Sequence, residues 1–173
     1  MNPPQVLPAS APLPSAATLH LVCGKIGSGK STLTQRLASA PHTVRISVDD
    51  WLSRLHPHEI HALADYVRCA GRLRDAMSGH IESLLRSGVS VVLDFPANTV
   101  ATRAWMQGLC ERAGAAHVLH LLDVPDEVCK ARLRARNAAG DHPFETSDAE
   151  FDQISRHFVA PTADEGFTVV PHR

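Results

Sequence analysis

A glycine-rich segment close to the start of the sequence carries its strongest chemical pattern. The segment, Gly24-Lys-Ile-Gly-Ser-Gly29-Lys30-Ser31, fits the GxxxxGKS/T pattern of phosphate-binding loops. Glycines let backbone N–H groups turn inward and approach phosphate oxygens closely, and the N-terminus of a following helix adds partial positive charge. The segment therefore predicts a binding site for a nucleoside triphosphate between a strand and a helix.

The side chains of this loop have separate expected roles. Lys30 would place a full positive charge on the β and γ phosphates, and the Ser31 hydroxyl would be a ligand of Mg²⁺. The alternative for the same pattern is a glycine-rich strand-to-helix turn that binds nothing. The expected cofactors are ATP and Mg²⁺, and the expected nucleotide-binding residues are Gly24, Gly27, Ser28, Gly29, Lys30, Ser31 and Thr32.

Motifs that the sequence lacks narrow the kind of nucleotide-binding protein. There is no NKxD motif to read a guanine base, and the carboxylate that follows the third expected strand begins Asp94-Phe-Pro-Ala rather than DxxG. A GTPase switch is therefore disfavoured. No LSGGQ-type signature is present, which disfavours a transporter ATPase, and 173 residues are few for an oligomeric motor ATPase.

Two adjacent carboxylates, Asp49 and Asp50, end the apolar segment Val44–Val48, which we expect to be a strand. The carboxyl ends of parallel strands face the ligand crevice. A hydroxyl acceptor needs a carboxylate there to orient it and take its proton during phosphoryl transfer. We expect one of the two to be this base, with Asp49 favoured over Asp50, and the other to cap the next helix, because aspartate is a good N-cap.

A third carboxylate, Asp94, follows the apolar and β-branched run Val89–Leu93 in a Walker B-like arrangement. It could hold a Mg²⁺-bound water or a substrate hydroxyl. The alternative is a structural role in the turn after the strand.

Two arginines, Arg132 and Arg136, are four residues apart in an expected helix and so share one face. Two guanidiniums there suit the charge that spreads over a transferring γ-phosphoryl group. Arg134 should point elsewhere, at about 200° around the helix axis from Arg132. The alternative is a solvated arginine-rich helix. The following segment, residues 140–143, suggests a mobile lid over the donor.

Other chemically capable residues carry weaker signals. Among the histidines at positions 56, 58 and 61, His58 and His61 would share one face of a helix, but no third ligand of the usual type follows at a suitable spacing, so a metal site is disfavoured. The two tryptophans are expected to pack rather than to stack on a ligand. Four widely spaced cysteines form no CxxC pair and are expected to be reduced and buried, as in a cytoplasmic protein: Cys23, Cys69, Cys110 and Cys129.

The elements that must position these residues alternate along the chain. The expected strands are 19–23, 44–48, 89–93, 118–122 and 167–170. The expected helices are 30–40, 58–87 with a break near Gly71 or Gly79, 99–113, 125–138, and 148–159, the last opened by a capping box at Ser147 and Glu150. Strands that alternate with helices predict an α/β fold with a mostly parallel sheet.

Composition and chain organisation fit one globular domain. A hydrophobic fraction of 44% disfavours whole-chain disorder, and a net charge of −1 lacks the global basic signature of many nucleic-acid binders. No apolar run is long enough to cross a bilayer, and no secretory signal is evident. Residues 1–17 are rich in proline and lack charge, so we expect a flexible leader before a domain at 18–173.

Taken together, these segments resemble the small P-loop kinases, a group that includes polynucleotide 5′-kinase, chloramphenicol phosphotransferase, gluconate kinase and the zeta-toxin kinases. The resemblance runs from about Thr18 to Val170. It rests on Gly24–Ser31, on Val48-Asp49-Asp50-Trp51, on Asp94 with Asn98-Thr99 and Arg103, and on Arg132 and Arg136 at the places of the group's lid arginines.

The resemblance implies a three-layer P-loop sandwich in which a five-stranded parallel sheet has the loop strand in its middle, and ATP–Mg²⁺ as donor. It implies three sets of residues: Lys30, Asp49, Arg132 and Arg136 as catalytic; Asp49, Asp50, Asp94, Asn98 and Arg103 as substrate-binding; Ser31 and Asp94 as metal ligands.

The function expected from the sequence is transfer of the γ-phosphoryl group of ATP to a hydroxyl of a small molecule, such as a nucleoside-like compound, an amino sugar or an antibiotic. One alternative is a polynucleotide 5′-kinase-like enzyme, because the segment 51–86 holds several arginines, although acids and histidines lie between them. The other is a nucleotide-binding regulatory module that hydrolyses ATP slowly. A nucleic-acid partner stays open but is not favoured, and no membrane partner is expected.

Overall fold

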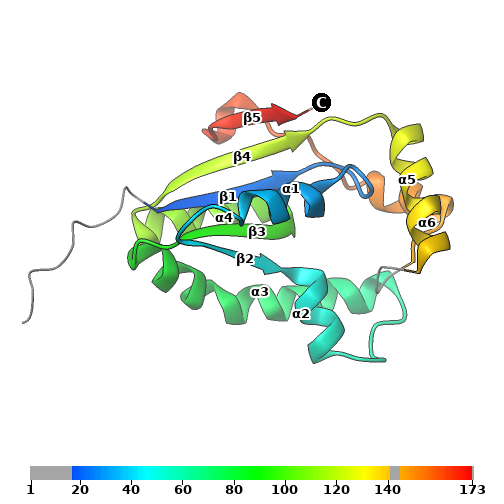
Figure 1. Ribbon diagram of the computed structural model, residues 1–173, viewed down its shortest axis with the longest axis horizontal. Helices are drawn as coiled ribbons and strands as arrows, with labels where there is room; N and C mark the ends of the chain where they lie inside the picture. The colour runs from blue at the N-terminus through cyan, green and yellow to red at the C-terminus, as the bar shows by residue number, and fades with distance from the viewer. Residues whose placement is uncertain (1–16, 141–144, 173) are drawn as a thin grey trace, which may run out of the picture.

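The computed structural model describes residues 17–140 and 145–172, which form a five-stranded sheet with helices on both faces (Figure 1). The strands are β1 (Thr18–Cys23), β2 (Thr43–Ser47), β3 (Ser90–Pro96), β4 (Ala116–Leu122) and β5 (Val169–His172). The helices are α1 (Lys30–Leu37), α2 (Val48–Leu55), α3 (Leu63–Arg86), α4 (Val100–Ala113), α5 (Asp126–Ala139) and α6 (Asp148–Ser155), with a 3₁₀ turn η1 (Ala163–Glu165).

All strand pairings are parallel, in the order β2-β3-β1-β4-β5. The strand that leads into the phosphate-binding loop therefore lies in the middle, between β3 and β4, and the predicted α/β sandwich is confirmed. Because parallel strands end at the same edge, the chain leaves β1, β2 and β3 on one side of the molecule. α2, α5 and α6 gather at that side (Figure 1).

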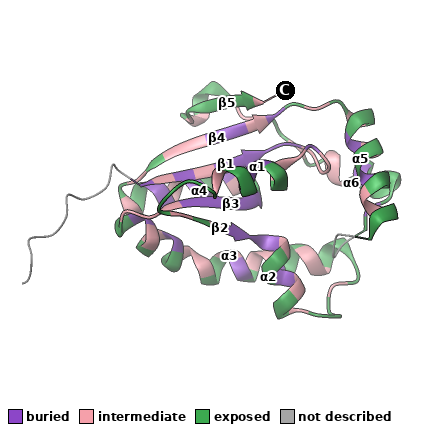
Figure 2. Ribbon diagram, in the orientation of Figure 1, coloured by how far each residue is buried: buried purple, intermediate pink, exposed green. Residues whose placement is uncertain are grey.

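The core lies on both faces of this sheet because successive strand residues point to opposite sides. On β1, Leu19, Leu21 and Cys23 join the large cluster that α3 and α4 cover, whereas Val22 packs with Leu33 of α1 on the other face. β3 is buried along most of its length, as its apolar run predicts (Figure 2). The four cysteines are buried and form no disulfide among the described residues.

Helix α3 corrects one sequence-based expectation. It runs without a break from Leu63 to Arg86, so the predicted interruption near Gly71 or Gly79 is wrong. A Cβ built at either glycine would meet nothing within 4 Å, so both lie on an open part of the helix surface. A glycine there costs only about 1 kcal/mol relative to alanine, which a helix packed along the sheet and α4 can tolerate.

Helix α2 corrects a second expectation from the sequence. It begins at Val48, where the sequence suggested a strand end, and its N-cap is Ser47, whose hydroxyl accepts a hydrogen bond from the Asp50 N–H at 3.3 Å. Neither Asp49 nor Asp50 is therefore the cap, and both lie in the first helical turn. The cap of α6 is confirmed: Ser147 and Glu150 form the predicted capping box.

Two predicted segments lie partly or wholly outside the described residues. Of the proline-rich leader expected at 1–17, only Ala17 is described; it is buried, and its carbonyl accepts a hydrogen bond from the Ala116 N–H at 3.1 Å. Of the lid expected at 140–143, only Gly140 is described, as the C-cap of α5.

Three histidines join neighbouring strands on the face that α1 covers. His20 Nδ1 lies 3.1 Å from His120 Nε2, and His120 Nδ1 lies 2.9 Å from His172 Nε2. This imidazole row links β1, β4 and β5. Over the described ranges, no helix has the length and apolar character that a membrane crossing requires.

Candidate active site

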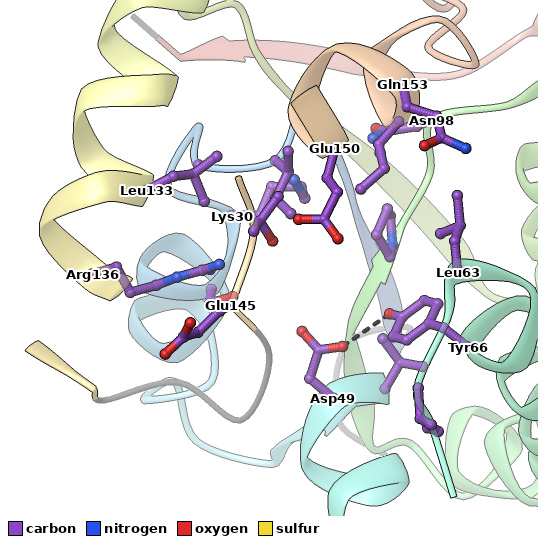
Figure 3. Close-up of a pocket in the computed structure, with 18 of the residues that line it drawn as sticks. Lys30, Asp49, Leu63, Tyr66, Asn98, Leu133, Arg136, Glu145, Glu150 and Gln153 are labelled. Carbon is purple, nitrogen blue, oxygen red and sulfur yellow. Dashed lines mark hydrogen bonds between the residues drawn. The ribbon is translucent and has the colours of Figure 1, made fainter. Parts of the chain in front are cut away.

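A cavity of about 1070 Å³ opens at the carboxyl end of the strands. Its floor is the phosphate-binding loop and the start of α1. One wall comes from α2 and the start of α3, and the other from α5 and α6 (Figure 3). Segments far apart in the sequence thus surround one space, with the loop at its base.

The backbone of the loop is shaped by glycines that no other residue could replace without strain. Gly27 has φ 78° and Gly29 has φ 101°, both in the left-handed region. A Cβ on Gly27 would lie 2.7 Å from the Cys129 carbonyl oxygen and 3.0 Å from Leu133 Cγ. The loop therefore packs directly against α5.

Asn98 fixes the other end of the loop. Its side-chain oxygen accepts from the Gly24 N–H and its amide donates to the Gly24 carbonyl, each at 2.9 Å. Asn98 also lines the cavity. The predicted substrate contact stays a prediction, but the structure gives this residue a clear task in holding the loop.

Lys30 lies at the base of the cavity. Its ammonium donates to the carbonyl oxygens of Gly24 at 2.7 Å and Lys25 at 2.8 Å. Burial lowers the pKa of Lys30 to about 8, while the negative charge of Asp94 acts in the opposite direction. The positions of Lys30 and of the adjacent Ser31 and Thr32, all in the lining, suit contacts with a polyphosphate.

Asp94, at the end of β3, faces the same space and is bound by an arginine that the sequence did not single out. The carboxylate is almost fully buried and pairs with Arg45 of β2. Arg45 also bonds to Asp50 at 3.0 Å and to the Thr34 hydroxyl at 3.1 Å. No motif marks Arg45, because its importance comes only from the pairing of β2 with β3.

The two adjacent aspartates of α2 point in different directions. Asp49 lines the cavity, and its carboxylate accepts a hydrogen bond from the Tyr66 hydroxyl at 2.9 Å (Figure 3). Burial, followed by the charge of Asp49, raises the pKa of Tyr66 well above its usual range. The Asp50 side chain is 61% exposed and is not part of the described lining. This arrangement favours Asp49 over Asp50 as the base.

The arginines of α5 divide as their spacing predicts. Arg132 and Arg136 line the cavity, and Arg132 donates to the Ser28 carbonyl at 3.1 Å. Burial lowers the pKa of Arg136, and the charge of Asp49 opposes that effect, as expected for groups that face one another across the cavity. Arg134 lies on the outer side and pairs with Asp148 at 3.3 Å.

Arg103, like Asp50, is a predicted substrate-binding residue that is absent from the described lining of the cavity. Its side chain is 0% exposed and forms a two-point ion pair with Glu165, with Arg103 Nε–Glu165 Oε2 at 2.6 Å and Nη2–Oε1 at 2.9 Å. It also donates to the carbonyls of Ala97 and Val159. A guanidinium so completely engaged in the core favours a structural role over the predicted substrate contact.

The outer part of the cavity contains residues that the sequence gave no reason to choose. Tyr66, the only tyrosine of the chain, belongs to no motif. Glu150 could be recognised only as a capping residue. His61 lies in the lining, and no group of described residues is arranged to hold a metal through histidine, cysteine, aspartate or glutamate. Beyond the α5 residues, the wall on the side of α6 is lined by Glu145, Thr146, Glu150, Gln153 and Ile154.

The loop between β1 and α1, the parallel strand order and the ring of charged side chains define a P-loop nucleotide-binding domain of the kinase-like type. A family model for AAA domains, AAA_33, matches residues 19–161, and the chain belongs to this family. No curated protein matches the chain in sequence.

Solved structures show the same fold at low sequence identity. A proposed kinase from Chloroflexus aurantiacus J-10-fl is 20% identical, with a TM-score of 0.74 over 91% of this chain and 85% of that one. A gluconokinase from Sinorhizobium meliloti 1021 is 17% identical, with a TM-score of 0.55 over 90% of this chain and 82% of that one. A chain of the Pnkp1/Rnl/Hen1 RNA repair complex is 17% identical, with a TM-score of 0.60 over 82% of this chain but only 43% of that one.

Proposed function

We propose that the protein is an ATP-dependent phosphotransferase that moves the γ-phosphoryl group to a hydroxyl of a small molecule, such as a nucleoside-like compound, an amino sugar or an antibiotic. One observation carries the proposal: Lys30 of the phosphate-binding loop and Asp49 of α2 line the same cavity. A phosphate-binding group and an oriented carboxylate in one space are what transfer to an alcohol requires.

The donor half of the site would hold ATP through backbone N–H groups of the loop and the ammonium of Lys30. The Ser31 hydroxyl and the Asp94 carboxylate lie near Lys30 and offer oxygen ligands of the kind that Mg²⁺ prefers, so these residues fit the ion. Bound Mg²⁺ would neutralise charge on the β and γ phosphates. Asp94 would act through a water or directly, after release of its pairing with Arg45.

The acceptor half would work through Asp49. The carboxylate orients the acceptor hydroxyl and takes its proton while a bond forms between that oxygen and the γ phosphorus. The bond from the γ phosphorus to the bridging oxygen breaks at the same time, and ADP leaves with the electron pair. Arg132 and Arg136 would stabilise the charge on the transferring group from the opposite wall.

Two alternative functions can be distinguished from phosphoryl transfer to a small molecule. The first alternative is a polynucleotide 5′-kinase, and the structural likeness to a chain of the RNA repair complex supports keeping it in the test. A nucleotide-binding regulatory module would need no acceptor base, and the position of Asp49 in the cavity speaks against it.

The experiment that tests the proposal is a screen for acceptor-dependent release of ADP from ATP–Mg²⁺, over hydroxyl compounds and an oligonucleotide with a free 5′-hydroxyl. We expect a small-molecule acceptor to raise ADP release above the background and to appear as a phosphomonoester by mass spectrometry. Stimulation by the oligonucleotide alone would favour the polynucleotide kinase. Binding of ATP with no stimulation by any compound would favour the regulatory module.

A further inference from the structure

We propose that the acceptor is an amine-bearing alcohol whose ammonium group is bound by Glu150 of α6. The inference rests on the proposed function, because it assumes that the acceptor occupies the outer part of the cavity. It narrows the acceptor to one charge class and assigns a specificity-determining role to a residue that the sequence marks only as part of a helix cap.

Charge is unevenly distributed around the cavity. The cationic groups in its described lining, Lys30, Arg132 and Arg136, lie at the loop and on α5, where the phosphates of the donor belong. Carboxylates surround the outer part: Asp49 on one wall, and Glu145 and Glu150 on the other. Figure 3 shows the Glu150 side chain directed into the space between Lys30 and Tyr66. An acceptor that reaches Asp49 therefore lies between this carboxylate and Glu150, with Arg136 of the same wall as Glu150 facing Asp49 from the side of the transferring phosphoryl group.

Glu150 is held in place by the cap of its own helix. Its Oε2 accepts from the Ser147 N–H and from the Ser147 hydroxyl, each at 2.8 Å. These hydrogen bonds, that of the backbone first, lower the pKa of Glu150, so the group is a carboxylate at neutral pH. A carboxylate has about four lone-pair positions, so it can receive an ammonium donor as well as these two bonds.

The outer part of the cavity does not suit an anionic acceptor. The arginines at positions 54, 68, 72, 74 and 86, which could serve a nucleic-acid end, are all absent from the described lining of the cavity. Three of them pair with acids on their own helix: Arg68 with Asp65, Arg74 with Asp75 and Arg86 with Glu82. A phosphate-bearing acceptor would place its charge among the outer carboxylates, and like charges in such proximity are unfavourable.

The wall opposite Glu150 suits the carbon body of such an acceptor. Ile60, Leu63 and Tyr66 line the cavity near Asp49 and present apolar surface there. A hydroxyl directed at Asp49, an apolar or ring carbon frame against α3 and an ammonium directed at α6 together describe an amino sugar or an aminocyclitol. A neutral sugar would lack the charged contact, and a sugar phosphate would be repelled.

The test compares matched acceptors with one another: glucosamine, N-acetylglucosamine and glucosamine 6-phosphate, together with kanamycin and its fully N-acetylated form. Acceptor-dependent ADP release is measured for the wild type, for Glu150→Gln and for Asp148→Asn. Gln at 150 preserves the capping box while it removes the charge. Asp148 lies on the same helix, pairs with Arg134 and is not in the described lining, so it is the matched control.

We expect free amines to exceed their acetylated and phosphorylated forms in kcat/KM by roughly 2- to 5-fold, the range of one ion pair at an exposed carboxylate such as Glu150. Glu150→Gln should remove most of that preference, chiefly by raising KM for the amine, and Asp148→Asn should retain it.

Equal or better use of the neutral or phosphorylated forms would overturn the inference while the kinase function stands. Retention of the amine preference by Glu150→Gln would also overturn it. ATP binding without stimulation by any of these probes, in a protein that fails the broader screen as well, would overturn the proposed function and the inference with it.

Discussion

The two halves of the cavity are built in different ways. In the proposed function, the donor half is mainly one continuous segment of chain whose backbone would do most of the binding; Asn98 holds this segment at one end, and α5 packs against it at Gly27. The acceptor half is assembled from α2, α3, α5 and α6, and it depends on charged side chains that are distant in sequence. Under the proposed function, a local segment of the chain would specify the donor, whereas the tertiary structure would specify the acceptor.

The largest expected effect is on the acceptor half. Asp49→Asn keeps size and most hydrogen bonding but removes basicity, so phosphorylation of an identified acceptor should fall by roughly 10²–10⁴-fold. ATP binding should persist, because the loop does not depend on Asp49. Rates of phosphomonoester formation check this.

Asp50→Asn is the matched control for that change. Asp50 is largely exposed and outside the described lining, and an asparagine oxygen at this position can still accept the hydrogen bond from Arg45, so the substitution should alter transfer little. Loss of transfer in Asp50→Asn with full transfer in Asp49→Asn would mean that the wrong aspartate has been named.

The donor half is tested by Lys30→Ala. Removal of the charge at the base of the cavity should lower kcat by about 10²–10³-fold and should reduce the increase in melting temperature that ATP–Mg²⁺ produces. Lys130→Ala is the control, because Lys130 lies on α5 and pairs with Asp152. An equal ATP-induced shift for wild type and Lys30→Ala would contradict the assignment.

The wall that both halves share is tested by Arg136→Ala, which should reduce kcat by about a hundredfold. Arg134→Ala removes an arginine from the same helix, but from its outer side, and should do little. Similar losses in the two variants would show that the effect comes from the helix and not from the charge in the cavity.

A smaller effect is expected from Tyr66→Phe, which removes the hydroxyl that holds Asp49 and leaves the ring in place. We expect kcat to fall by about 3- to 10-fold, as for loss of one hydrogen bond. A kcat equal to that of the wild type would assign Tyr66 to packing alone.

The sequence predicted the locally specified parts of the molecule better than the parts that depend on tertiary structure. The loop, the strand before it and the parallel sheet were predictable, because a motif and short apolar runs specify them locally. Helix α2 was not, since Val48 continues the apolar pattern of β2 and yet is the first residue of the helix after Ser47. Tyr66, Arg45 and Glu150 could not be placed in the site either, because only the packing of distant elements brings them there.

The imidazole row across β1, β4 and β5 makes the stability of the sheet depend on proton concentration. Burial lowers the pKa of His20, and burial followed by the charges of His20, His172 and Arg36 lowers that of His120 to about 4. The unfolded chain, with ordinary histidine pKa values near 6.5, therefore binds more protons than the folded one in mild acid. The stabilisation is fully present above about pH 6.5 and is lost as the pH falls toward 4.

At pH 5, His120 alone should account for about 2 kcal/mol of lost unfolding free energy. Urea unfolding at pH 7.5 and pH 5 checks this, with His120→Gln as the comparison, because the carboxylates titrate alike in both proteins. Equal losses in the two would refute it. Hydrogen exchange at pH 5 should show that backbone amides at the β4–β5 edge lose protection before those of β1 and β3. Protonation would thus detach the outermost strand locally, while the strand that leads into the phosphate-binding loop stays paired.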